Sequence, residues 1–197
     1  MLKSLFLAFT TYSRIPVPHT EWSEKNMRWC ICFFPLVGLV IGVVEFLWLL
    51  LARILGLPLL LRGAVASVLP ILLTGGIHLD GYCDTVDGLS SHQSRERKLE
   101  ILKDPNAGAF AVIFLGVWLL LYFSGWICLN QMSSVLAVGF AFILSRACSG
   151  LAMTNWKHAR EQGMLRSVAD AAKKKTVTAV MLVYIILSAV CLILFSS

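Results

Sequence analysis

The sequence predicts an all-α fold, a polytopic helical membrane protein, because long apolar runs recur along it and charged residues are few. Hydrophobic residues make up 58% of the 197 residues and charged residues only 14%, a balance unlike that of an ordinary soluble domain. Several apolar runs reach the length of about 20 residues that a helix needs to cross a bilayer. We therefore expect about five transmembrane helices, near residues 30–52, 57–79, 107–129, 132–153 and 176–195.

The N-terminal segment is expected to lie at the membrane surface. Its first residues, MLKSLFLAFTTY, hold an apolar run that is too short for a span. The residues RIPVP follow where a signal peptide would need its cleavage site. An N-terminal interfacial helix fits this pattern.

Basic residues gather in alternate connections, and this sets the predicted orientation. They precede the first run and fill the second and fourth intervals, whereas the opposite connections carry only Arg53 and Arg62. The positive-inside rule then places the N-terminus and the loops at about 80–106 and 154–175 in the cytoplasm. The net charge of +6 is mainly an orientation signal at the lipid bilayer, so no nucleic-acid partner is expected. We interpret residues 1–197 as a single integral membrane domain with functional cytoplasmic loops.

The first run contains a pattern for close helix packing. In FPLVGLVIG, Gly38 and Gly42 lie four residues apart on one helix face, and small residues at this spacing let two helix backbones approach.

Three aspartates follow one another at the predicted cytoplasmic end of the second apolar run, in the sequence GGIHLDGYCDTVDG at 75–88. If this segment is helical, Asp80, Asp84 and Asp87 lie within an arc of roughly 60°. Like charges so close repel, and Mg²⁺ held by carboxylates, water and substrate phosphate oxygens would relieve the repulsion. The alternative is a solvated loop of helix-capping aspartates, because Asp beside Gly is common in turns.

Three further ionisable residues are functional candidates because of their positions. Arg146 and Glu45 fall inside apolar runs, where charge is costly and often functional. Arg146 could reach a phosphate near the carboxylates, or it could form an internal ion pair or snorkel toward the membrane surface. For Glu45 we favour a structural role. His78 falls on the helix side opposite the three aspartates and is either catalytic or a hydrogen-bonded interfacial residue.

The stretch SRERKLEILKD predicts an amphipathic cytoplasmic helix over 94–103, stopped by Pro105. Arg95, Lys98 and Lys103 could present a basic face to phosphate. The alternative is an ordinary solvated face.

At this point the residues support a family resemblance. GGIHLDGYCDTVDG, followed by SRERKLEILKDPNAGAF, resembles the signature of the cobalamin synthase family, the adenosylcobinamide-GDP ribazoletransferases. Corresponding stretches elsewhere in the chain are YSRIPVP, FPLVGLVIG, the pair Ser145-Arg146 and HAREQG at 158–163. The stretches occur in the family's order and cover most of the chain.

The resemblance implies an enzyme of the bacterial cytoplasmic (inner) membrane. It would use Mg²⁺ to join adenosylcobinamide-GDP to α-ribazole, or to α-ribazole 5'-phosphate, with release of GMP. A ribose hydroxyl would attack the phosphorus nearest the cobinamide arm, and GMP would leave in line. On this model Asp80, Asp84 and Asp87 hold the metal, and Asp104 is a further ligand or orients the hydroxyl. The expected substrate-binding residues are Arg95, Lys98, Lys103, Arg146 and Arg160.

The sequence departs from the family pattern at its end. The family usually continues with further spans and a Gly-Asp-containing motif, whereas this sequence stops at LILFSS. We expect either a truncated or naturally short form, or the absence of part of the site. After Gly163, a second glycine common in the family is missing. The oligomeric state, including a homo-oligomer, is left open.

Two other function classes are alternatives. A CDP-alcohol phosphotransferase is suggested by Asp84-x-x-Asp87-Gly88 followed by Arg95, but the second half of that family's acidic motif is missing. A cation transporter could use Glu45, Asp80 and Arg146. Against it, the acidic residues cluster at one face of the membrane.

Overall fold

All the regular elements in the described part of the chain are helices, which confirms the predicted all-α membrane architecture. The computed structural model describes residues 1–159 and 163–195. In chain order the elements are α1 (Leu2–Tyr12), α2 (Glu24–Met27), the 3₁₀ helix η1 (Ile31–Phe33), α3 (Phe34–Ile54), α4 (Leu59–Thr74), α5 (Ile77–Ser90), α6 (Arg95–Ile101), α7 (Ala109–Cys128), α8 (Met132–Asn155), α9 (Met164–Ala171) and α10 (Lys174–Phe195).

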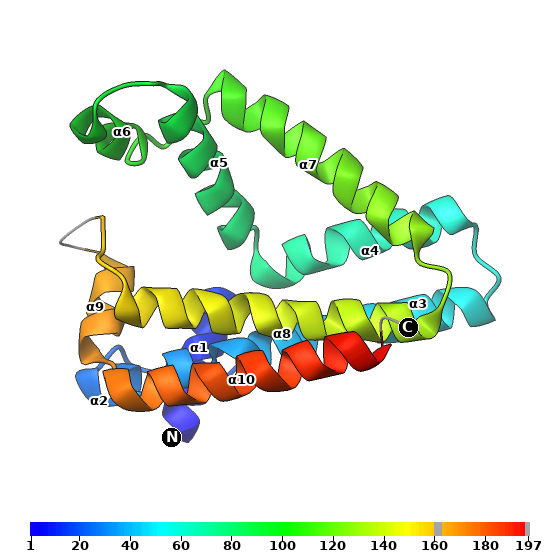
Figure 1. The fold of residues 1–197 in the computed structure, drawn as a ribbon, viewed down its shortest axis with the longest axis horizontal. Coiled ribbons are helices and arrows are strands. Elements are labelled where there is room, and N and C mark those ends of the chain that lie inside the picture. The colour runs from blue at the N-terminus through cyan, green and yellow to red at the C-terminus, as the bar shows by residue number, and fades with distance from the viewer. Residues whose placement is uncertain (160–162, 196–197) are drawn as a thin grey trace.

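Helices α3, α8 and α10 pack side by side, while α4, α5 and α7 form a triangular frame over them (Figure 1). Within residues 1–159 and 163–195, four helical segments are long and apolar enough to span a membrane, and the bent pair α4 and α5 is a fifth candidate. The four are Glu24–Ile54, Ala109–Cys128, Met132–Asn155 and Lys174–Phe195. Four of the five predicted spans are thus continuous helices.

The predicted span over 57–79 is the exception, because it is broken. The axes of α4 and α5 differ by 92°, and the bend falls at Gly75 and Gly76, whose φ angles are +66° and +80°. Glycine reaches this left-handed region without the steric penalty that a Cβ imposes. As a result, residues 77–79 begin the helix that carries the aspartates rather than ending a straight span.

Arg14 braces this elbow from the N-terminal segment. Its backbone N–H donates to the Leu73 carbonyl at 2.8 Å, and a Cβ added to Gly75 would lie 2.5 Å from Arg14 Nε. Helix α1 itself packs on protein, since Leu7 and Ala8 are fully buried against the core around the start of α3. Its placement at a membrane surface stays a prediction.

Close contact between α3 and α8 confirms the packing role predicted for the glycines of FPLVGLVIG. A Cβ added to Gly38 would lie 2.5 Å from the Phe142 carbonyl oxygen, and one added to Gly42 would lie 2.8 Å from Gly139 Cα. Both obstacles are backbone atoms, so neither can rotate away. Any larger residue must push the two helices apart.

We expect Gly42→Leu to lower the free energy of unfolding by about 2 kcal/mol or more, because overpacking a helix interface forces backbone shifts. Thermal unfolding of the detergent-purified protein measures the effect. The matched control is Gly116→Leu on α7, where an added Cβ meets nothing within 4 Å. Equal midpoints for the two variants would contradict the close α3–α8 packing.

Candidate functional site

Helix α5 presents the three aspartates of the predicted motif on one face. It is helical from Ile77 to Ser90, and the prediction that the three aspartates share one face required such a helix. Asp80 is exposed, whereas Asp84 and Asp87 are half-buried. Since the helix already begins at Ile77, His78 lies on the side away from the aspartates, as predicted.

Asp87 caps the start of α7. Its Oδ2 accepts a hydrogen bond from the Gly108 backbone N–H at 2.6 Å, and its Oδ1 accepts one from the Ala111 N–H at 2.8 Å. These N–H groups would otherwise lack partners in the first turn, and the carboxylate also suits the positive end of the helix dipole. For Asp87 the helix-capping alternative therefore describes the structure. Its remaining lone pairs could still face a metal ion.

A cleft of about 390 Å³ joins the two segments that the sequence marked as functional. From α5 it is lined by Gly81, Asp84 and Thr85, from the connection into α9 by His158, and from α9 itself by Arg166. Apolar side chains complete the lining. Arg166 Nε donates to Asp170 Oδ2 at 2.7 Å, which orients the guanidinium. The cleft puts carboxylate, imidazole and guanidinium groups around one space.

The candidate residues of the sequence prediction omitted His158 and Arg166, although HAREQG includes the histidine. The stretch itself was the available signal, since it matched the family without suggesting a role for each residue. Arg160, the candidate from this stretch, lies outside the described residues.

The carboxylates of Asp80 and Asp84 on α5 are oxygen donors of the kind that Mg²⁺ prefers. In the described ranges, no three His, Cys, Asp or Glu side chains are grouped as a metal site. However, Mg²⁺ typically uses one or two protein carboxylates and takes its other ligands from water and substrate phosphates. Asp80 and Asp84 lie one turn apart on α5, and Asp84 lines the open cleft. Among the described residues, these two carboxylates are the ones that would hold a Mg²⁺ ion at the cleft.

Asp104 lies in the exposed loop between α6 and α7. Its Oδ1 accepts hydrogen bonds from the Asn106 backbone N–H at 2.9 Å and from the Asn106 side-chain amide at 2.8 Å. These bonds lower the pKa of the Asp104 carboxyl, with the backbone bond as the larger cause. A lowered pKa makes this carboxylate a weaker base than an ordinary aspartate, so it suits a cation better than a proton.

The basic residues of α6 lie beside the cleft without lining it. The helix starts at Arg95, after Ser94 accepts a hydrogen bond from the Arg97 N–H, close to the predicted boundary. Arg95 and Lys103 are exposed and Lys98 is half-buried. None of these three predicted phosphate-binding residues is among the lining residues of the cleft.

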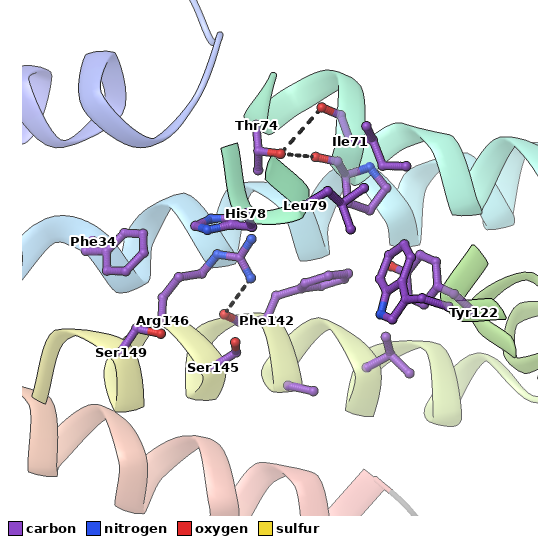
Figure 2. A pocket seen from close by; sticks show the side chains of 14 residues that line it. Phe34, Ile71, Thr74, His78, Leu79, Tyr122, Phe142, Ser145, Arg146 and Ser149 are labelled. Atoms are coloured by element: carbon purple, nitrogen blue, oxygen red, sulfur yellow. Dashed lines mark hydrogen bonds between the residues drawn. The ribbon is translucent and has the colours of Figure 1, made fainter. Parts of the chain in front are cut away.

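Arg146 and His78 line the same cavity, which is separate from the cleft that Asp84 lines. This cavity of about 490 Å³ lies between the α4–α5 elbow, α7 and α8, and Figure 2 shows the Arg146 guanidinium next to His78. Arg146 is 7% exposed, so the snorkelling alternative does not describe it. Glu45 on α3 is also buried, and its carboxylate oxygens have no hydrogen-bond partner within the described residues.

A family whose sequence model is described as cobalamin-5-phosphate synthase matches residues 4–197. The chain belongs to this family. It is 47% identical over 195 residues to an adenosylcobinamide-GDP ribazoletransferase of Lachnoclostridium phytofermentans, an alignment that covers 99% of this chain and 74% of that protein. A protein of the same name from Desulfitobacterium hafniense is 40% identical over 178 residues, which are 88% of this chain and 69% of the relative.

Membership of the cobalamin-5-phosphate synthase family confirms the resemblance seen in the sequence. A third relative, an adenosylcobinamide-GDP ribazoletransferase from Alkaliphilus oremlandii, is 33% identical over 175 residues, which are 88% of this chain and 70% of that protein. No solved structure matches the chain. As a member of this family, with relatives named as transferases, the chain is a transferase. Its apolar helices make it a multi-pass membrane protein.

Proposed function

We propose that this chain joins adenosylcobinamide-GDP to α-ribazole, or to α-ribazole 5'-phosphate, in a Mg²⁺-dependent reaction that releases GMP. The observation that carries the proposal is the cleft between α5 and α9, which Asp84, His158 and Arg166 line together. A cleft that combines a carboxylate with a guanidinium suits a pyrophosphate and its metal ion. The family and the names of its relatives supply the identity of the substrates.

Residues in the cleft and beside it on α5 have separate roles in the proposed phosphoryl transfer. Asp80 and Asp84 would hold Mg²⁺, which supplies neutralisation of the pyrophosphate charge. The Arg166 guanidinium, oriented by Asp170, stabilises negative charge on the phosphoryl oxygens. His158 lines the same cleft and can accept the proton of the attacking ribose hydroxyl. Asp87 positions α7 against α5 and contributes by holding the wall of the cleft in place.

We also propose that the cleft faces the cytoplasm of a bacterial cell, at the inner membrane. The basic segments that were assigned to the cytoplasm from the sequence lie toward one end of the molecule, around α2, α6 and α9 (Figure 1). The positive-inside rule favours placing that end in the cytoplasm. The substrates, which are water-soluble phosphates, would then reach the cleft directly.

The decisive experiment is a metal-removal assay with the purified chain in lipid vesicles. We expect adenosylcobinamide-GDP and α-ribazole to give GMP with Mg²⁺ present, and EDTA to lower the rate by roughly 100-fold or more, since charge neutralisation is lost. Excess Mg²⁺ added after EDTA should restore the rate. GMP release that is indifferent to EDTA would contradict the metal assignment, and failure to release GMP under any condition would contradict the proposed reaction.

A further inference from the structure

The cavity that holds Arg146 and His78 has the walls of a binding site. Aromatic rings from three helices form its apolar sides, namely Phe34, Trp118, Tyr122 and Phe142. Trp118 and Tyr122 stack with ring centroids 4.7 Å apart, which gives one wall a flat, rigid surface. A volume of about 490 Å³ lies within the range of cavities that enclose small molecules.

Arg146 places a positive charge in this cavity and forms no ion pair with a described acidic residue. Its Nη1 donates to the Phe142 carbonyl oxygen of its own helix at 3.3 Å, and its buried Nε has no hydrogen-bond partner in the described structure. Both ion pairs found among the described residues lie elsewhere, on α6 and α9. The buried Glu45 carboxylate on α3 makes no hydrogen bond to Arg146.

The position of the Arg146 side chain is supported by a glycine on the facing helix. A Cβ added to Gly38 would lie 2.8 Å from Arg146 Cδ, so Gly38 leaves the space that the aliphatic part of the side chain fills. The Phe142 ring lies 5.4 Å from the guanidinium carbon. Arg146 is therefore held in the cavity rather than extended toward water, although an unneutralised charge in a membrane span is costly.

The groups around Arg146 indicate which anion would neutralise it. Ser145 and Ser149 line the same cavity from α8, and His78 lines it from α5 (Figure 2). A guanidinium fork with added hydroxyl and imidazole donors offers more hydrogen bonds than the two oxygens of a carboxylate can use. A phosphate group has the three terminal oxygens and the charge that match this donor set.

We propose that this cavity binds an apolar molecule that carries a phosphate group. The phosphate lies on Arg146, Ser145 and Ser149, and the apolar body lies between the aromatic walls. Two sources share this chemistry: a membrane lipid that ends in a phosphate monoester, and a soluble aromatic phosphate monoester. Binding here does not depend on the transfer reaction in the cleft between α5 and α9, since the two spaces have no lining residue in common.

Equilibrium dialysis of the full chain in neutral detergent tests the proposal. The probes are 1-naphthyl phosphate and dodecyl phosphate, each compared with its uncharged analogue, 1-naphthol or dodecanol. We expect at least one phosphate to bind saturably and roughly 10-fold more tightly than its analogue, because a charge-assisted bond to a buried guanidinium is gained. Preference for the naphthyl compound identifies a soluble aromatic phosphate, and preference for the dodecyl compound identifies a lipid.

Two variants test whether the Arg146 charge, rather than the apolar space of the cavity, causes the preference for phosphate. Arg146→Gln should remove the preference for the phosphate while binding of the uncharged analogue stays within about twofold, which shows that the cavity is intact. Arg53→Gln is the matched control, since Arg53 donates to the Leu129 and Asn130 carbonyl oxygens at the far end of α3 and should change nothing. The proposal is overturned if neither phosphate binds better than its analogue, or if Arg146→Gln keeps the full preference.

Discussion

Replacing Asp84 with Asn should lower Mg²⁺-dependent GMP release by at least roughly 100-fold, because the substitution removes a negative oxygen donor from the cleft. The amide keeps the size of the side chain, so the helix and its packing should remain. Asp84 is the member of the aspartate motif that lines the cleft with His158 and Arg166. The measurement is the initial rate of GMP release in vesicles over a range of Mg²⁺ concentrations, together with a thermal midpoint.

The control for Asp84 is Glu100→Gln, which removes an exposed carboxylate on α6. Glu100 pairs with Arg97 at 2.6 Å on the protein surface, and such pairs contribute about 1 kcal/mol or less. We expect this variant to keep the wild-type rate within about twofold. An Asp84→Asn enzyme with wild-type rate and wild-type Mg²⁺ dependence would show that the cleft is not the metal site.

Asp87→Asn should act mainly on stability, with a loss of about 1–2 kcal/mol, because a charged cap at the start of α7 becomes a neutral one. An amide has one acceptor oxygen, whereas the Asp87 carboxylate uses both of its oxygens for the Gly108 and Ala111 N–H groups. The rate should fall as the wall of the cleft loosens. However, the Mg²⁺ concentration for half-maximal rate should stay within about twofold of the wild type.

Gly108→Ala offers a matched test of the capping role. A Cβ at this position would lie 2.7 Å from Asp87 Oδ1, so the substitution disturbs the cap without changing any carboxylate. We expect it to reproduce the stability loss of Asp87→Asn and to leave the Mg²⁺ dependence alone. If Asp87→Asn instead raises the Mg²⁺ requirement strongly while Gly108→Ala does not, then Asp87 is a metal ligand as well as a cap.

Hydropathy predicts most of the helices because the energy of burying apolar side chains in lipid depends on local composition. Hydropathy fails at the α4–α5 elbow because composition alone does not report where the backbone turns. The run over 57–79 is predominantly apolar, and averaging over a window hides two adjacent glycines with positive φ angles, at which the chain turns by 92°. Conformational freedom, rather than hydrophobicity, decides the structure at Gly75 and Gly76.

The candidate site was predicted in part, and the limit again has a physical cause. Helical spacing placed the three aspartates on one face of α5 correctly, because that relation is local. The contact of Asp87 with Gly108 and the meeting of Asp84 with His158 join residues far apart in the sequence, so no spacing rule could reveal them. The same holds for Arg146, which lies beside His78 in a separate cavity rather than in the cleft with Asp84.

The contact between Arg14 and the elbow matters for how the protein is produced and handled. Residues near the N-terminus are often trimmed by proteases or fused to purification tags, yet here Arg14 is hydrogen-bonded to Leu73, just before the turn into α5. Clipping of this segment during extraction would release the elbow and mimic the loss of a cleft residue. The intact mass of each preparation should therefore be verified before any activity defect is assigned to a substitution.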